Sequence, residues 1–168
     1  MRIWLLVFVS AILVSSGTSA SARIEVSYDD PDRFMDAGDR NSDPRHVVQD
    51  LESHFQTLGK RHITGDRTLS IRILDLDRAG RPWHNLPTGL RVMNGRNDRP
   101  CVDLEWSLRT ASGESSGRRE RICDMDYLRR LSGRYSENDP LVYEKRMLDE
   151  WFAARFGMAK PVSMQPEK

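Results

Sequence analysis

Residues 69–80 contain the most regular alternation of apolar and polar side chains that the chain shows beyond its first 22 residues. The apolar positions stand two apart: Leu69, Ile71 and Ile73. Leucine and β-branched isoleucine at this period predict a strand with one buried face. The charged residues that follow the strand then decide what chemistry it can support.

Two aspartates at the end of this strand leave its geometry undecided. If the alternation continued, Asp75 and Asp77 would face the core, where two charges are costly unless they are paired or bind a metal. A bulge near Leu74 would instead turn Leu74 and Leu76 towards the core. The residues alone leave both alternatives open.

A strand and a helix are predicted before this stretch. Residues 23–28 alternate and end at Pro31, which fixes φ and removes a backbone donor. The helix is expected to begin at Asp43 as its cap and Pro44 as its first residue, and to end at Gly59. Its apolar stripe has helical spacing: Val47, Val48, Leu51, Phe55 and Leu58. A strand, helix and strand of this length favour a right-handed crossover, which would make the two strands parallel.

Residues 101–123 predict a β-hairpin. Two alternating runs flank a three-residue loop that ends in Gly113, which is free to adopt a left-handed conformation. One register places Cys101 opposite Cys123. The same register aligns an apolar pair and two pairs of opposite charge: Val102 with Ile122, Asp103 with Arg121, and Glu105 with Arg119.

The two cysteines are the only ones in the chain. An even count favours a disulfide in an oxidising compartment. Directly opposed residues at a non-hydrogen-bonded site lie about 4.5 Å apart at Cα, within disulfide reach. Closing a loop of this length is worth on the order of 3 kcal/mol by the chain-entropy estimate. We therefore predict a bond between Cys101 and Cys123.

A second main helix is predicted near the C-terminus, with Asp139 as its cap, Pro140 as its first residue and Gly157 at its end. A short strand at residues 90–93 and a short helical piece after Tyr127 lie between the other elements. The predicted fold is α+β, with a mixed, mostly antiparallel sheet of about five strands packed against two main helices. The expected order is β-α-β-β-β-β-α-α.

The first 22 residues have the pattern of a signal peptide. Arg2 is their only charge, an apolar run follows it, and small residues lead to an A-x-A site that ends at Ala22. The apolar run is shorter than the roughly 20 residues that a spanning helix needs. We therefore expect a cleaved leader at 1–22, a single domain at 23–157 and a flexible tail at 158–168. The mature protein would be periplasmic or secreted, without a membrane span.

The charge balance gives no sign of a polyanionic partner. The chain has 26 Lys and Arg against 25 Asp and Glu, and loss of Arg2 with the leader makes the mature protein formally neutral. A neutral surface lacks the basic footprint of proteins that bind nucleic acid. Oligomeric state is not indicated by any pattern in the chain.

Four aspartates are expected at one edge of the sheet. Asp75 and Asp77 end one predicted strand, and Asp29 and Asp30 end its parallel neighbour. Oxygen ligands of this kind suit a hard cation such as calcium. The alternative is structural: the aspartates cap the turn at Gly80 or pair with nearby arginines. No EF-hand spacing is present.

Two further residues are candidates for a role beyond packing. Glu144 falls on the apolar stripe of the last helix, where it is a general base with a raised pKa or, more commonly, a half-buried ion pair with an arginine. Trp83 follows a proline in a loop, where it either contacts a partner or folds down over the core. No sequence typical of a catalytic nucleophile is present, so we predict no catalytic residue.

Several stretches together resemble an exported bacterial family known only as a domain of unknown function (domain of unknown function 3016). The likeness extends over nearly the whole mature chain, and it is carried by residues 26–31, 34, 36, 69–71, 75–77, 79–80, 124–127, 143–145, 147–148 and 151–152. The family pattern has an apolar residue where this chain has Arg78, and it has no matching cysteine pair. The resemblance implies an envelope location and supplies no catalytic residue.

These observations favour a non-catalytic periplasmic module that binds or stabilises another envelope component, either a protein or part of the cell wall. The alternative is a metal-binding protein or enzyme that uses the carboxylates around Asp75 and Asp77, with calcium as the cofactor. The first interpretation needs no cofactor.

Overall fold

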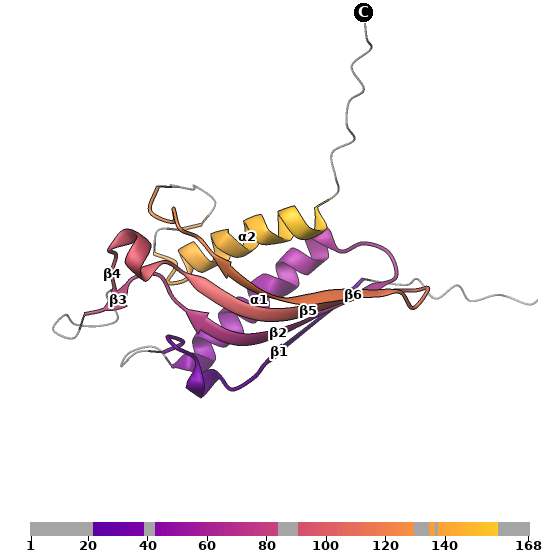
Figure 1. Ribbon diagram of the computed structural model, residues 1–168, viewed down its shortest axis with the longest axis horizontal. Helices are drawn as coiled ribbons and strands as arrows, with labels where there is room; N and C mark the ends of the chain where they lie inside the picture. The colour runs from indigo at the N-terminus through magenta and orange to yellow at the C-terminus, as the bar shows by residue number, and fades with distance from the viewer. Residues whose placement is uncertain (1–21, 39–42, 84–90, 130–134, 137, 158–168) are drawn as a thin grey trace, which may run out of the picture.

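A four-stranded sheet forms the centre of the molecule, and two helices lie on one side of it (Figure 1). The computed structural model describes residues 22–38, 43–83, 91–129, 135–136 and 138–157. The elements follow in the order β1 (Arg23–Tyr28), α1 (Pro44–His62), β2 (Arg67–Asp77), β3 (Arg81–Pro82), β4 (Arg91–Val92), β5 (Cys101–Thr110), β6 (Ser115–Cys123) and α2 (Val142–Phe156). Two short 3-10 turns, η1 (Pro31–Arg33) and η2 (Gly95–Asp98), precede α1 and β5.

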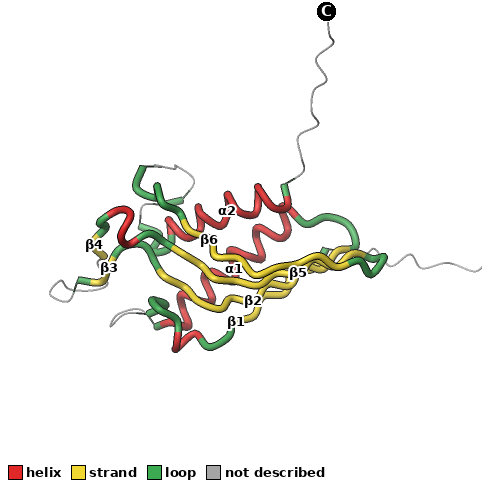
Figure 2. Tube along the Cα trace, in the orientation of Figure 1, coloured by secondary structure: helices red, strands yellow, loops and turns green. Residues whose placement is uncertain are grey.

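The main sheet has the order β1-β2-β5-β6. The β1–β2 pair is parallel, while β2–β5 and β5–β6 are antiparallel. The predicted α+β class, the parallel first pair and the mostly antiparallel sheet are therefore confirmed. The expected sheet of about five strands is instead four strands and a separate pair, β3–β4, which lies at one end of the molecule (Figure 2).

The hairpin has the predicted register. Cys101 faces Cys123, and the apolar and charged pairs align as expected along β5 and β6. Gly113 in the connecting turn has a φ of 84°, which a residue with a side chain rarely adopts. This part of the fold was determined locally, because alternation, charge pairing and turn chemistry all agreed on one register.

The core lies between the helices and the inner face of the sheet. It includes the predicted α1 stripe and buried residues of the two central strands, β2 and β5. The largest fully buried side chains are Tyr127, Phe55, Phe152, Leu51, Leu58, Leu69, Ile71, Ile73, Leu76, Leu104, Leu141 and Leu148. The prediction that α1 ends at Gly59 is wrong, because the helix continues to His62. Gly59 instead lets Ile24 of β1 pack directly on the helix backbone, where a Cβ would collide with the isoleucine side chain.

The start of α2 also differs from the prediction. Asp139 and Pro140 precede the helix, which begins at Val142. Asp139 Oδ1 accepts a hydrogen bond from the Leu141 amide at 2.9 Å, and Oδ2 lies 2.8 Å from Lys145 Nζ. The aspartate therefore stabilises the turn that leads into the helix, and its bond to Lys145 joins this turn to the first turn of the helix.

Buried polar groups join the two helices. His54 Nε2 of α1 lies 3.1 Å from both the Lys145 carbonyl and Asp149 Oδ1 of α2. Both partners are acceptors, so this nitrogen carries the proton. Burial lowers the pKa of His54, against the opposing charge of Asp149. These contacts tie α1 to α2.

Several sequence predictions lie outside the described residues. They concern the leader, the tail at 158–168, the end of the helical piece after Tyr127, and most of the loop beyond Trp83. Within the described part of the chain, neither helix has the length and apolar character that a bilayer span requires.

Candidate functional site

The face of the main sheet that points away from the helices is polar. Side chains alternate along each strand, so Leu69, Ile71 and Ile73 of β2 face the core while Ser70 and Arg72 face outwards. The register aligns two outward rows across all four strands: Glu25–Ser70–Ser107–Gly117 and Ser27–Arg72–Glu105–Arg119. We call the surface formed by these two rows the open face.

A groove of about 600 Å³ crosses the open face. Its lining residues come from all four strands: Glu25, Val26, Ser27, Ser70, Ile71, Arg72, Glu105, Trp106, Ser107, Ser115, Gly117, Arg118 and Arg119. Its floor is low because one row contains two serines and a glycine. A Cβ at Gly117 would collide with the Trp106 carbonyl oxygen, so β6 approaches β5 closely only with glycine at this position.

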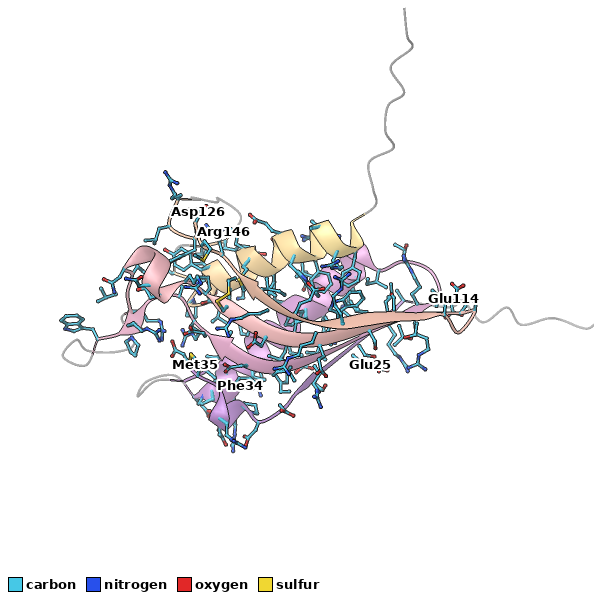
Figure 3. The ribbon with its side chains drawn as sticks, in the orientation of Figure 1. Glu25, Phe34, Met35, Glu114, Asp126 and Arg146 are labelled. Carbon is cyan, nitrogen blue, oxygen red and sulfur yellow. A yellow bond between two sulfur atoms is a disulfide. The ribbon has the colours of Figure 1, made fainter. Side chains whose placement is uncertain are left out.

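Charges of both signs border the groove. Arg72 and Glu105 form a cross-strand ion pair at 3.2 Å with both side chains about half exposed. Ser70 Oγ donates to Glu25 Oε2 at 3.3 Å, and Glu25 lies on β1 at the opposite edge from β6 (Figure 3). These groups can supply hydrogen bonds and charge to a bound partner, and the groove-lining residues include neither histidine nor cysteine.

A bulge settles the position of the two strand-end aspartates. The β2–β5 register shifts between Ile73 and Asp75, and Leu76 then faces the core with no exposed surface. Asp75 and Asp77 consequently lie on the outward side, opposite Asp103 and Cys101. The second sequence alternative is therefore correct for Leu76, although Leu74 remains only half-buried.

Asp75 and Asp77 each hold a neighbouring loop. Asp75 Oδ1 accepts the Met35 amide at 2.7 Å and the Leu76 amide at 2.9 Å. Asp77 lies 3.5 Å from Arg81. Burial raises the pKa of Asp77; Arg81 opposes this rise and the negative charge of Asp36 adds to it.

The four-aspartate calcium hypothesis is not supported by the placement of these groups. Asp29 and Asp30 are exposed, and the carboxylates that raise the pKa of Asp77 are Asp36 and Asp75. Among the described residues, no three His, Cys, Asp or Glu side chains are arranged to hold a metal ion. Calcium binding stays an untested prediction.

Glu144 is fully buried, and its hydrogen-bond partner is a backbone amide. Oε1 accepts the Ala79 amide at 2.7 Å, while Oε2 accepts no hydrogen bond within the described part of the chain. Burial raises the pKa of this carboxyl, against the lowering effects of the Ala79 amide and the nearby Arg78 and Arg91 charges. The side chain lies deeper than the half-buried position that was predicted, because α2 packs it over the turn that follows β2. Its pairing with an arginine stays a prediction.

Asp36 and Arg91 form a buried ion pair that no sequence pattern indicated. Arg91 Nη1 lies 3.3 Å from Asp36 Oδ1, and Nη2 bonds to Oδ2. The same guanidinium donates to the carbonyls of Ala79 and Gly80, each at 2.8 Å. Only 5% of the arginine side chain and 7% of the aspartate side chain are exposed. We call Asp36, Arg78, Arg91 and Glu144 the buried charge cluster.

The buried charge cluster predicts a specific pH dependence. The folded-state pKa of Glu144 is raised, so at pH values between 4.5 and that pKa the folded protein holds a proton that the unfolded chain has lost. The contribution of Glu144 to stability is therefore present at acidic pH below its usual value of 4.5 and is lost as the pH rises through the folded-state pKa. Urea denaturation at several pH values between 4 and 8 should show that the wild type loses stability relative to Glu144→Gln as the pH rises. Parallel pH profiles for the two proteins would contradict the assignment.

Trp83 and the cysteine pair lie at the same end of the sheet as β3–β4 and the C-terminal end of β6. Trp83 is 54% exposed, so the alternative in which it covers the core is wrong, and its role as a partner contact stays a prediction. Cys101 and Cys123 are joined in the structure with a Cα–Cα distance of 4.2 Å. Phe34 and Met35 also lie at this end, opposite the hairpin tip marked by Glu114 (Figure 3).

Comparisons with known proteins identify a family but no activity. The family model described as "Protein of unknown function (DUF3016)" matches residues 22–154. No curated protein matches the chain. Among solved structures, the chain is similar to a crystal structure of a Xanthomonas campestris protein assigned to the family model DUF330, with 12% identity, 83% coverage of each chain and a TM-score of 0.35. A TM-score this low carries no argument about fold or function.

Proposed function

The chain belongs to the family of proteins of unknown function DUF3016, and from this premise we propose that it is a non-catalytic binding module of the cell envelope. Its binding surface is the open face. The observation that carries the proposal is the groove of about 600 Å³, which crosses a polar sheet face that no described element covers.

Two features of the chain support an envelope location, and a third concerns the partner. The first 22 residues have the charge, apolar run and small-residue site of a cleaved leader. The two cysteines stand opposite each other across neighbouring strands, as a structural disulfide in an oxidising compartment requires. The mature chain is formally neutral, which favours a partner other than nucleic acid.

The chemistry of the groove favours binding over catalysis. Its arginines and glutamates are exposed or already paired, as Arg72 is with Glu105. The carboxyls with raised pKa values, Asp77 and Glu144, do not line it. Serine hydroxyls and charges of both signs on a curved sheet suit a polar polymer such as an envelope protein segment or a cell-wall component.

Site-specific photo-crosslinking in the native envelope tests the proposal. A crosslinking amino acid at Glu25, on the rim of the groove, should yield a light-dependent adduct with an envelope component. The control places the crosslinking amino acid at position 53, where Ser53 is exposed on α1 away from the sheet, and it should yield no adduct. Filling the groove with Ser107→Trp should reduce the Glu25 adduct. The adducts should be found in the periplasmic fraction. The mass of the protein in them should correspond to a chain that begins at Arg23.

Two results would contradict the proposal. Equal adducts at Glu25 and Ser53 would mean that the contacts are nonspecific. A Glu25 adduct that Ser107→Trp leaves unchanged would mean that the groove is not the binding surface.

A further inference from the structure

The strand β6 is an edge of the main sheet, and its outer backbone groups can be assigned. Within the described residues, β6 pairs only with β5. The Thr110 amide donates to the Glu114 carbonyl at 2.9 Å, and the Asp124 amide donates to the Pro100 carbonyl at 3.2 Å. Hydrogen-bonded and non-hydrogen-bonded pairs alternate in an antiparallel ladder. Between β5 and β6, the hydrogen-bonded pairs are therefore those of even-numbered residues.

The odd-numbered residues of β6 therefore direct their N–H and C=O groups away from β5. Four of them are Ser115, Gly117, Arg119 and Arg121, and the fifth is the half-buried Cys123 at the end of the strand. The first four are exposed, and the groove of the open face extends to this edge through Ser115 and Gly117. An added strand would find here a row of backbone donors and acceptors with the spacing that pairing needs.

The side chains along this edge are basic on both faces of the sheet. Arg119 and Arg121 lie on the open face, and Arg118 lies on the helix face with its side chain 59% exposed. The one acid in β6, Glu120, accepts hydrogen bonds from the indole nitrogens of Trp106 and Trp151 at 2.8 and 3.1 Å. It also pairs with Arg155 at 2.9 Å and with Arg118 at 3.3 Å, and Arg121 pairs with Asp103 of β5 at 3.4 Å. The strand itself still carries three arginines against one glutamate.

We propose that the free edge of β6 binds an acidic polypeptide segment in extended conformation, as a fifth strand of the main sheet. The proposal rests on the proposed binding function and names the partner class as protein. Backbone pairing with residues 115–121 supplies the affinity, and acidic side chains beside Arg118, Arg119 and Arg121 supply the selectivity. A second copy of β6 is a poorer occupant, because two such strands bring six arginines together at one seam.

Peptide titration of the full exported chain tests this assignment. The probe is a fluorescent eight-residue peptide of alternating glutamate and threonine, and its control has lysine in place of each glutamate. The acidic peptide should bind at least about tenfold more tightly than the basic one. Arg119→Glu should remove this preference, and the lysine peptide should gain affinity for that variant. Binding of both peptides with equal affinity, or of neither, would overturn the proposal and leave the arginines as groups that keep the edge from pairing.

Backbone pairing has its own test. Proline at position 119 removes an outward N–H that makes no bond to β5, so Arg119→Pro should weaken acidic-peptide binding at least about tenfold beyond Arg119→Ala. If the proline variant does not fold, hydrogen exchange on the wild type gives the same information: the peptide should protect the amides of Gly117, Arg119 and Arg121. Unchanged exchange at these amides would overturn the proposal.

Failure of this inference is separable from failure of the proposed function. If Arg119→Glu leaves the Glu25 photo-adduct unchanged, the open face binds a partner without using the edge, and only the fifth-strand proposal is lost. A sedimentation measurement that shows a dimer abolished by Arg119→Glu would assign the edge to a second copy and would also overturn it.

Discussion

Replacing Arg91 with methionine is expected to lower the free energy of unfolding by about 3–5 kcal/mol. The guanidinium is the buried partner of Asp36 and also donates to the carbonyls of Ala79 and Gly80. Methionine keeps much of the side-chain volume but removes every donor. A buried carboxylate and two carbonyls would then lose their partners, and this is the situation in which breaking an ion pair costs most. Equilibrium denaturation in urea measures the loss.

An exposed ion pair of the main sheet provides the matched control. Arg72 pairs with Glu105 at 3.2 Å, and its side chain is 51% exposed. Arg72→Met should cost at most about 1 kcal/mol, because water screens the pair and solvates the remaining glutamate. Similar losses for the two variants would show that Arg91 acts through packing alone. Adding Asp36→Leu to Arg91→Met should recover part of the loss, because no isolated charge then remains buried.

The hairpin could be predicted from the residues because each local signal was strong and all agreed. Alternation set the faces of β5 and β6, Gly113 set the turn, and opposed charges chose the register. A register error of one residue would have turned every apolar side chain of β5 to the wrong face, so few alternatives competed.

The bulge in β2 could not be decided from the sequence, because both alternatives satisfied the same local pattern. The decision depends on groups that are distant in the chain. Asp75 accepts the Met35 amide across 40 residues, and Asp77 pairs with Arg81 beyond the turn. Once these partners hold the aspartates on the outward side, Leu76 takes the core position.

The buried charge cluster was missed for a related reason. Asp36 and Arg91 stand 55 residues apart in polar stretches that carry no periodicity. Arg78 occupies a position where the resembling family pattern has an apolar residue, and the structure buries it beside Glu144 with 3% exposure. The apolar residue of the family pattern at this position thus indicated burial of Arg78. Nothing in the sequence indicated which acidic side chain would lie beside it.

The cross-strand cysteine pair supports the second large prediction. Replacing both cysteines by alanine is expected to lower the free energy of unfolding by about 3 kcal/mol, because the bond closes a loop between positions 22 apart and so restricts the unfolded chain. Thermal and urea unfolding of the wild type and of Cys101→Ala/Cys123→Ala measure the difference. A reducing agent should lower the stability of the wild type towards that of the variant and leave the variant unchanged.

Most of the lost stability should come from the greater conformational entropy of the unfolded chain. The folded structure should change little, because other pairs still specify the strand register. Val102 opposite Ile122 and Asp103 opposite Arg121 remain in the double variant, with the last pair 3.4 Å apart. The alanine variant should therefore keep the native sheet, and its extra hydrogen exchange should appear first in the last residues of β6, which pair only with β5 among the described strands. Thiol labelling of unreduced, denatured wild type should find no reactive cysteine. Two labelled thiols would show that the pair is not bonded, and the predicted difference in stability would then shrink to the effect of two small side-chain truncations.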